Sequence, residues 1–239
     1  MESSSPSCAI RPLPKRTLIL AINGIRVKQD FKAWTRRFDW WLDVNLDGNI
    51  VAERYEYTCS AIFRFKGQRA RVDELIELIN TYKNDENFDY EIVLVGHSNG
   101  NDIIQRLLNL GIHVNEVHCF APAAFEADFA RAIRKKSFKR MFIYGSPKDK
   151  ALRAARDASF LTRFLSFILA PFGIPHLGYG YLGLNGGGFA SRFPTVVTDC
   201  SQPEFDHSTW FDDEQFDRTM SLFKANYLSS RTVTPPTTP

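Results

Sequence analysis

The sequence EIVLVGHSNG occupies residues 91–100 and decides the fold class of this chain. Its first half is an apolar, β-branched run, which predicts a strand that is buried on both faces. Its second half has Ser98 between Gly96 and Gly100 and leads into the amphipathic pattern of a helix. We therefore predict that Ser98 lies in a tight turn between a buried strand and a helix.

This spacing of serine and glycines has a chemical reading. A strained turn between strand and helix lifts the serine hydroxyl away from the sheet edge, and the flanking glycines remove Cβ atoms that would collide where the chain doubles back. The backbone N–H of Asn99, at the start of the helix, would face an oxyanion formed on an attacked carbonyl group. The motif predicts Ser98 as a nucleophile and Asn99 as an oxyanion donor. The alternative is an ordinary turn flanked by glycines.

Segments typical of strands and helices alternate on both sides of this stretch. Short β-branched or aliphatic runs indicate strands, and apolar residues that recur every three or four positions indicate helices. The predicted strands are 17–22, 51–63, 91–96, 114–122, 140–145 and 193–199, and the predicted helices are 31–46, 72–84, 101–111, 126–137 and 212–227. Repeated units of this length imply an α/β fold with a mostly parallel central sheet and helices on both faces.

The composition indicates how many domains the chain forms and which kinds of partner and site it lacks. A chain of 239 residues with 44% hydrophobic residues is expected to form one globular domain with one core. Its 30 basic and 27 acidic side chains give a formal net charge of +3, which argues against a nucleic-acid partner. The four cysteines are far apart in the sequence and form no C-x-x-C pair. We therefore expect no metal site.

The two ends of the chain are poor in residues that could be buried. Residues 1–16 and 229–239 are predicted to be flexible tails around a single domain at 17–228. The first residues lack the apolar stretch of a secretory signal, and the longest apolar run, 164–175, is shorter than the roughly 20 residues that cross a bilayer. The expected location is cytoplasmic.

A serine hydroxyl is a weak nucleophile unless a histidine, oriented by a carboxylate, removes its proton. Asp149 follows the predicted strand 140–145, and His207 follows the predicted strand 193–199. The carboxyl ends of parallel strands meet at one edge of a sheet. We therefore predict that Ser98, Asp149 and His207 form a catalytic triad at this edge, in the chain order serine, acid, histidine.

Other acidic residues and histidines are alternatives for the acid and the base of the triad. The rivals of Asp149, of which the first two are the strongest, are Glu126, Asp128, Asp157, Asp199 and Asp206. His176 is a second histidine beyond Asp149. The histidines that precede the acid in the chain are predicted to be structural, the first of them within the turn: His97, His113 and His118.

Residues 158–192 are more chain than one helix and one strand between Asp149 and His207 require. The stretch 158–175 is apolar, and 176–188 is rich in glycine. One interpretation is an insertion that forms a lid over an acyl pocket or a peripheral contact with a lipid surface. The other is a core helix followed by a tight connection, and the glycines at 186–188 are predicted to be flexible.

Four motifs together resemble the α/β-hydrolase superfamily and, within it, small serine esterases and lipase-like proteins: LILAINGIRV at 18–27, LVGHSNG at 94–100, YGSPKDKAL at 144–152 and DHSTWF at 206–211. The resemblance implies that the backbone N–H of Ile25 is the second oxyanion donor. Asn23 stands where the family usually has a histidine.

This resemblance implies a serine hydrolase that cleaves a carboxylic ester of a small molecule or lipid through an acyl-enzyme on Ser98, without a cofactor. The fold does not choose among substrates, because members of one fold catalyse different reactions. An acyltransferase or a thioesterase with the same triad is one alternative. A non-catalytic protein that binds lipid or a partner through 158–175 is another.

Overall fold

The computed structural model describes residues 12–24, 33–46, 48–57, 67–158 and 180–232. Their strands form one six-stranded sheet in the order β2-β1-β3-β4-β5-β6, and every neighbouring pair is parallel. The strands are β1 (Lys15–Ile22), β2 (Ile50–Tyr55), β3 (Asp89–His97), β4 (Val114–Phe120), β5 (Phe138–Tyr144) and β6 (Val197–Asp199). The predicted α/β fold with a parallel central sheet is confirmed.

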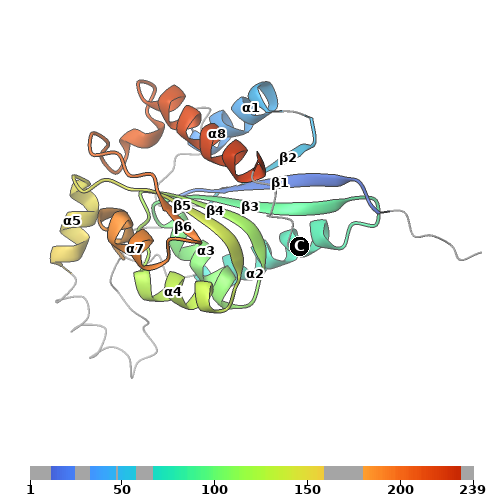
Figure 1. Ribbon diagram of the computed structural model, residues 1–239, viewed down its shortest axis with the longest axis horizontal. Helices are drawn as coiled ribbons and strands as arrows, with labels where there is room; N and C mark the ends of the chain where they lie inside the picture. Colours follow the sequence, from blue (N-terminus) through green and yellow to red (C-terminus); the bar gives the residue numbers. More distant parts are fainter. Residues whose placement is uncertain (1–11, 25–32, 47, 58–66, 159–179, 233–239) are drawn as a thin grey trace, which may run out of the picture.

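Helices cover both faces of the sheet (Figure 1). One face carries α1 (Trp34–Asn45) and α8 (Phe216–Thr232), and the other carries α2 (Gln68–Lys83), α3 (Gly100–Asn109) and α4 (Glu126–Arg134). Four shorter elements complete the described chain: α5 (Lys150–Asp157), η2 (Leu182–Leu184), α7 (Gly186–Arg192) and η3 (Thr209–Phe211). The molecule therefore has three layers, with the sheet in the middle.

The interior strand β1 contributes side chains to the cores on both faces of the sheet. Successive side chains of a strand point to opposite faces. Leu18, Leu20 and Ile22 are buried in the core that includes α2, α3 and α4. Ile19 and Ala21 are buried in the second core, with α1 and α8. Burial on both faces explains why residues 18–22 are all apolar.

The strand order reverses at β1, which lies between β2 and β3. Ligands of open parallel sheets bind outside the carboxyl ends of the strands at such a switch point, because the loops that leave the two neighbouring strands diverge there. Ser98 follows β3 directly. A Cβ atom on Gly24, just past β1, would lie 3.0 Å from the Ser98 Cβ. The predicted nucleophile therefore lies at the switch point.

The prediction of a flexible glycine-rich loop is wrong for residues 186–188, because Gly186 opens helix α7. A Cβ atom on Gly186 or Gly187 would lie 2.9 Å from a carboxylate oxygen of Asp199. The glycines thus let this carboxylate approach the amino end of the helix, where negative charge is favourable. Residues 159–179 lie outside the described residues, so the lid or lipid-contact role of 158–175 stays a prediction.

The predicted boundaries of the domain are too narrow. β1 begins at Lys15 rather than Thr17, and α8 continues past Leu228 to Thr232. Ser230 is only 3% exposed and donates a hydrogen bond to Glu116 of β4, which also accepts one from Arg231 at 3.2 Å. Residues 229–232 therefore belong to the domain. A buried carboxylate on a distant strand makes these polar residues part of the fold.

Ser230→Ala should lower the free energy of unfolding by about 1 to 2 kcal/mol, because the buried Glu116 carboxylate loses a donor. Ser221→Ala is the matched control: its hydroxyl bonds to the Asp217 carbonyl on the exposed surface of the same helix, and the change should stay within about 0.5 kcal/mol. Urea denaturation measures both variants. Equal effects would show that Ser230 is not part of the packed domain.

Candidate active site

The backbone at Ser98 has the strained conformation that the motif predicts. Its φ of +53° lies in the left-handed region, which residues other than glycine rarely adopt. The Ser98 N–H donates to the Phe120 carbonyl at 3.0 Å, and the Ser98 carbonyl accepts the N–H groups of Asn101 and Ala123, both at 3.2 Å. Contacts on both sides therefore hold the strained residue in place.

Each glycine of the motif is required by a close approach of neighbouring atoms. A Cβ atom on Gly96 would lie 2.6 Å from the Ile104 side chain, and one on Gly100 would lie 2.4 Å from the backbone oxygen of Ile22. The first glycine lets α3 pack against β3. The second lets α3 begin against the end of β1. The serine is thus fixed at the junction of two strands and a helix.

Ser98, His207 and Asp149 form one hydrogen-bonded line. Ser98 Oγ lies 2.8 Å from His207 Nε2, and His207 Nδ1 lies 2.8 Å from Asp149 Oδ2. A carboxylate only accepts hydrogen bonds, so the proton is assigned to His207 Nδ1. His207 Nε2 then has a free lone pair for the hydroxyl proton of Ser98. The structure thus brings the three predicted residues together.

Asp149 serves two neighbours at once. It is fully buried and precedes α5, where its Oδ1 accepts the N–H of Leu152 at 2.8 Å. Aspartate is a preferred residue at this position because it satisfies an unpaired N–H of the first helical turn. The cap fixes one carboxylate oxygen and leaves Oδ2 facing His207. The local sequence after β5 therefore positions the acid.

The rival acids are engaged elsewhere. Glu126 accepts from Asn185 at 2.8 Å and pairs with Arg192. Asp199 binds the backbone and side chain of Ser201. The other three pair with an arginine or with backbone N–H groups: Asp128 with Arg131, Asp157 with Arg156, and Asp206 with Lys150 and His207. Of the acids in the described ranges, Asp149 is the one bonded to the imidazole of His207.

The other histidines lie in different surroundings. His113 is exposed, and its Nδ1 donates to the Lys136 carbonyl at 3.2 Å. His118 is fully buried beneath α8, with Nδ1 at 3.0 Å from the Tyr144 hydroxyl. Burial lowers the pKa of His118. His176 lies outside the described residues.

His97 contacts the candidate base directly. Its Nε2 donates to the backbone oxygen of His207 at 3.0 Å, since a carbonyl can only accept. Burial, with the nearby His207 imidazole, lowers the pKa of His97 to about 3, although its hydrogen bond favours the charged form. His97 is therefore neutral at physiological pH. The sequence placed it in the turn but gave no sign of this contact.

The expected oxyanion donors are only partly described. Asn99 precedes the first residue of α3, so its N–H lies at the positive end of the helix dipole. Its side chain is 1% exposed and donates to the Tyr57 hydroxyl at 3.0 Å. Asn23, in place of the usual histidine, accepts the N–H of Tyr57 at 3.3 Å and ties the end of β1 to the chain after β2. Ile25 lies outside the described residues, so its role stays a prediction.

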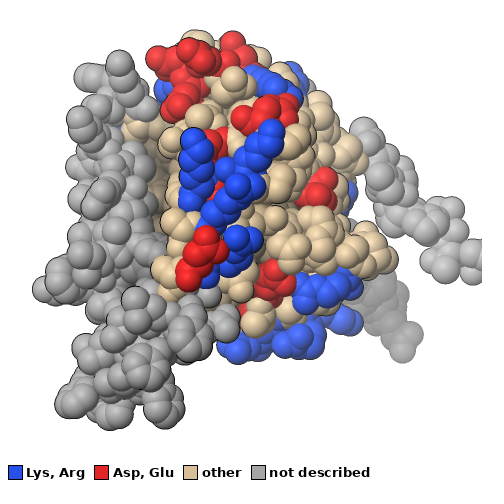
Figure 2. All heavy atoms as spheres, turned by 90° about the vertical axis from the view of Figure 1, so that its left-hand side faces the viewer, with Lys and Arg blue, Asp and Glu red and all other residues tan. Residues whose placement is uncertain are grey.

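A cavity of about 480 Å³ lies beside the loop that carries His207, where Figure 2 shows acidic side chains gathered at the top of the face. It is lined by Arg37, Glu204, Thr209, Phe211, Asp212, Asp213, Glu214 and Gln215. Four carboxylates in this lining make it a poor pocket for an apolar acyl chain. The lining includes none of the three aligned residues, so this cavity is not the space above Ser98.

Two further features of the described part of the chain concern metal ions and membranes. No three His, Cys, Asp or Glu side chains in the described ranges are grouped so that they could hold a metal ion. Among the same residues, no helix is both long and apolar enough to cross a membrane.

Gly100→Ala should destabilise the protein by about 1 to 3 kcal/mol and distort the turn at Ser98, because the new methyl group collides with the backbone of β1. Gly48→Ala is the control, since a Cβ atom there would have no neighbour within 4 Å. Thermal unfolding measures both variants. Equal stabilities for the two would contradict the close packing of α3 on β1.

His97 also predicts a pH dependence of stability. Its pKa of about 3 in the folded protein lies below the ordinary value of 6.5, so the unfolded chain binds the proton more tightly. Its contribution to stability is complete above pH 6.5, decreases as the pH falls below that, and reaches its minimum below pH 3. Between pH 7 and pH 4 the wild type should lose up to about 3 kcal/mol more than His97→Gln. Urea unfolding of both proteins at the two pH values measures this loss. An equal loss of unfolding free energy in wild type and His97→Gln would contradict the prediction.

Neither a family model nor a curated protein matches the sequence. Solved structures do match. Est1E from Butyrivibrio proteoclasticus is 13% identical, with a TM-score of 0.55 over 92% of this chain and 90% of that chain. The thermophilic esterase Est2 from the Planctomycetes species Thermogutta terrifontis is 12% identical, with a TM-score of 0.55 over 97% and 88%.

A third match has the same type of fold. Esterase B from Lactobacillus rhamnosis, in a structure inhibited by a tributyrin phosphonate, is 10% identical, with a TM-score of 0.51 over 91% of this chain and 77% of that chain. Likeness at such low identity shows the fold and not the activity. The parallel sheet, its two helical layers and these structural neighbours together show that the chain has the α/β-hydrolase fold.

Proposed function

We propose that the protein is a serine hydrolase that cleaves a carboxylic ester of a small molecule or lipid. The observation that carries the proposal is the line from Ser98 through His207 to Asp149, with 2.8 Å at each hydrogen bond. This arrangement has the nucleophile, the base and the orienting carboxylate within the distances that proton transfer requires. The esterases among the structural neighbours support the same reaction class.

The reaction proceeds in two halves. His207 Nε2 takes the hydroxyl proton as Ser98 Oγ attacks the ester carbonyl, and it then gives that proton to the departing alcohol, which leaves an acyl group on Ser98. Water next attacks the acyl group, and His207 Nε2 takes a proton from this water molecule. That proton returns to Ser98 Oγ as the acid is released. Asp149 holds the imidazole and stabilises its charged form.

Negative charge develops on the carbonyl oxygen in both halves. The backbone N–H of Asn99 and, by the family resemblance, that of Ile25 are its proposed donors. The amino end of α3 adds positive potential at the same place. His97 is neutral, as its pKa of about 3 requires. It therefore does not repel the imidazolium that forms on His207.

The location, the partners and the substrate chain length of the protein are also proposals. A cytoplasmic location, the absence of nucleic-acid partners and a peripheral lipid contact through 158–175 are expectations from the sequence. The substrate is taken to be short-chained for a first assay, because two structural neighbours are described with propionate and with a C4 tributyrin phosphonate. Short p-nitrophenyl esters are therefore the first substrates to use.

Ser98→Ala should lower turnover of p-nitrophenyl esters by about 10³-fold or more, because the reaction loses its nucleophile. A fluorophosphonate probe should label the wild type at Ser98, located by peptide mass spectrometry, and should not label the variant. Full activity of Ser98→Ala would overturn the proposal.

Labelling of the wild type without ester turnover would favour an acyltransferase, which is tested by adding an alcohol or an amine as the acyl acceptor. Vesicle binding by a folded protein that is neither labelled nor active would favour a non-catalytic lipid-binding protein.

The choice of acid has its own comparison. Asp149→Asn should lower turnover by about 10²-fold or more, because an amide can hold His207 in the wrong tautomer. Glu126→Gln and Asp128→Asn should retain turnover within about twofold, since both carboxylates pair away from the imidazole. A large loss in either control, with Asp149→Asn active, would reassign the acid.

A further inference from the structure

The main chain of His207 is held at both ends. Its N–H donates to Asp206 Oδ1 at 2.8 Å, and its carbonyl oxygen accepts from His97 Nε2 at 3.0 Å. These two bonds are separate from those of the imidazole with Ser98 and Asp149. The ring is thus fixed at its nitrogens and also at the backbone from which it extends.

Asp206 joins the two loops that carry the acid and the base. The same Oδ1 atom that accepts the His207 N–H also accepts the N–H of Lys150 at 2.9 Å. Lys150 directly follows Asp149 and opens α5. One carboxylate oxygen therefore fixes the distance between the loop after β5 and the loop after β6.

The surroundings of Asp206 keep this oxygen in place. Thr209 Oγ1 accepts the N–H of Asp206 at 2.8 Å and donates to its carbonyl at 3.1 Å, so the residue is held in a local turn. Burial opposes ionisation, but the N–H groups and charges of Lys150 and His207 outweigh it and lower the pKa of Asp206. The acceptor is a carboxylate, and hydrogen bonds to a charged group are stronger than neutral ones.

His97, the last residue of β3, binds the carbonyl end of the His207 main chain. It is the neighbour of Ser98 in the chain, so its bond to the His207 carbonyl links the turn to the histidine loop. Phe211 packs edge-on against the His97 ring at 5.4 Å, and Trp34 does so at 6.2 Å. The two aromatic rings stack on each other at 4.3 Å. They pack against the imidazole that donates the bond and so help to hold it in position.

We propose that Asp206 and His97 are positioning residues that clamp the main chain of His207 and so set its imidazole between Ser98 and Asp149. This inference rests on the proposed serine hydrolase function. The imidazole must take a proton from one oxygen atom and deliver it to another, and it becomes charged in between. A displacement of about 1 Å in such a group can cost about a hundredfold in rate. The clamp keeps the imidazole in the same position between Ser98 and Asp149 through both halves of the reaction.

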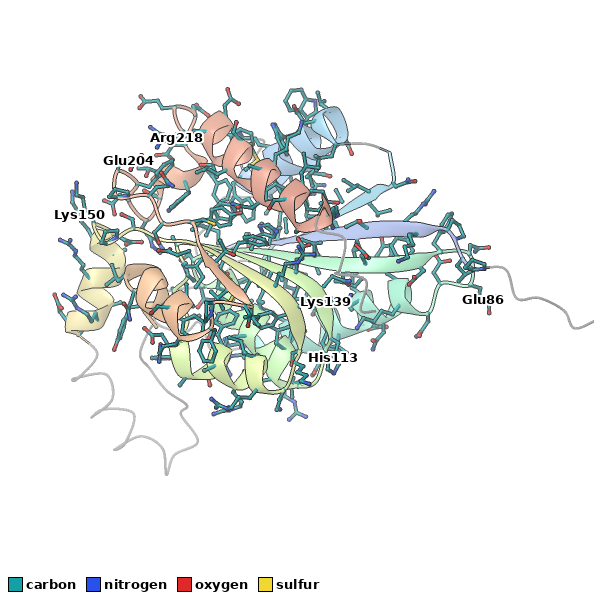
Figure 3. The ribbon with its side chains drawn as sticks, in the orientation of Figure 1. Glu86, His113, Lys139, Lys150, Glu204 and Arg218 are labelled. Carbon is teal, nitrogen blue, oxygen red and sulfur yellow. The ribbon has the colours of Figure 1, made fainter. Side chains whose placement is uncertain are left out.

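The structure offers a matched control for each residue at the other end of the sheet. Asp85 Oδ1 accepts two backbone N–H groups, those of Asn87 at 2.7 Å and Phe88 at 3.2 Å. His113 donates to a backbone carbonyl at 3.2 Å. Figure 3 shows Lys150 and Glu204 at one end of the molecule and Glu86 and His113 toward the other. Asp85→Ala and His113→Phe thus remove the same kinds of bond away from the site.

Asp206→Ala and His97→Phe should each lower kcat by about tenfold or more while KM changes by less than about twofold, because alignment and not binding is lost. Asp206→Asn keeps an acceptor oxygen and His97→Gln keeps a donor, so each should recover kcat to within about threefold. Asp85→Ala and His113→Phe should leave kcat unchanged. Thermal unfolding is measured for every variant, so that rates are compared between folded proteins.

Two results would overturn the clamp. One is full kcat in folded Asp206→Ala and His97→Phe. The other is an equal loss in the two controls, which would mean a general effect on stability. A wild type without ester turnover would refute the proposed function instead, and the clamp would then be read from proton NMR. The Nδ1 proton of His207 should exchange with water at least about tenfold faster in Asp206→Ala and His97→Phe than in the controls, and equal rates would overturn the clamp.

Discussion

The left-handed backbone of Ser98 is the constraint on which the rest of the site depends. It is held by hydrogen bonds to β4 and its following loop, and it leads into α3, which begins in contact with the end of β1. Strain of this kind persists where the surrounding structure over-determines it. Here the surrounding structure is the switch point of a parallel sheet. The same geometry that strains the serine also directs its hydroxyl to the edge where the loops after β5 and β6 meet.

The acid and the base reach this edge by different physical means. Asp149 is placed by its own helix, because it caps α5 with one oxygen and faces His207 with the other. His207 belongs to no helix or strand, so its position comes from hydrogen bonds to the segments around it. Asp206 and His97 supply two of these through its main chain. These hydrogen bonds hold a residue outside regular secondary structure at the distances that proton transfer needs.

Sequence patterns predicted the sheet, the turn and the meeting of Ser98, Asp149 and His207, because burial on both faces of a strand and the shared edge of parallel strands are visible locally. The clamp was not predictable, since a bond from His97 to the backbone of His207 joins segments 110 positions apart without any pattern. The helical state of 186–188 was missed for a similar reason. It depends on a carboxylate from β6, whereas glycine content alone predicts flexibility.

The aligned residues are proposed to perform acyl transfer through Ser98. Intact-protein mass spectrometry of the enzyme, quenched in acid within its first turnover of a p-nitrophenyl ester, tests this step. The expected result is a mass increase equal to one acyl group, located on the peptide that contains Ser98 and formed with a burst of nitrophenol equal to the enzyme concentration. An acyl group on another residue, or nitrophenol release by folded protein with no adduct and no burst under conditions where deacylation is slow, would contradict it.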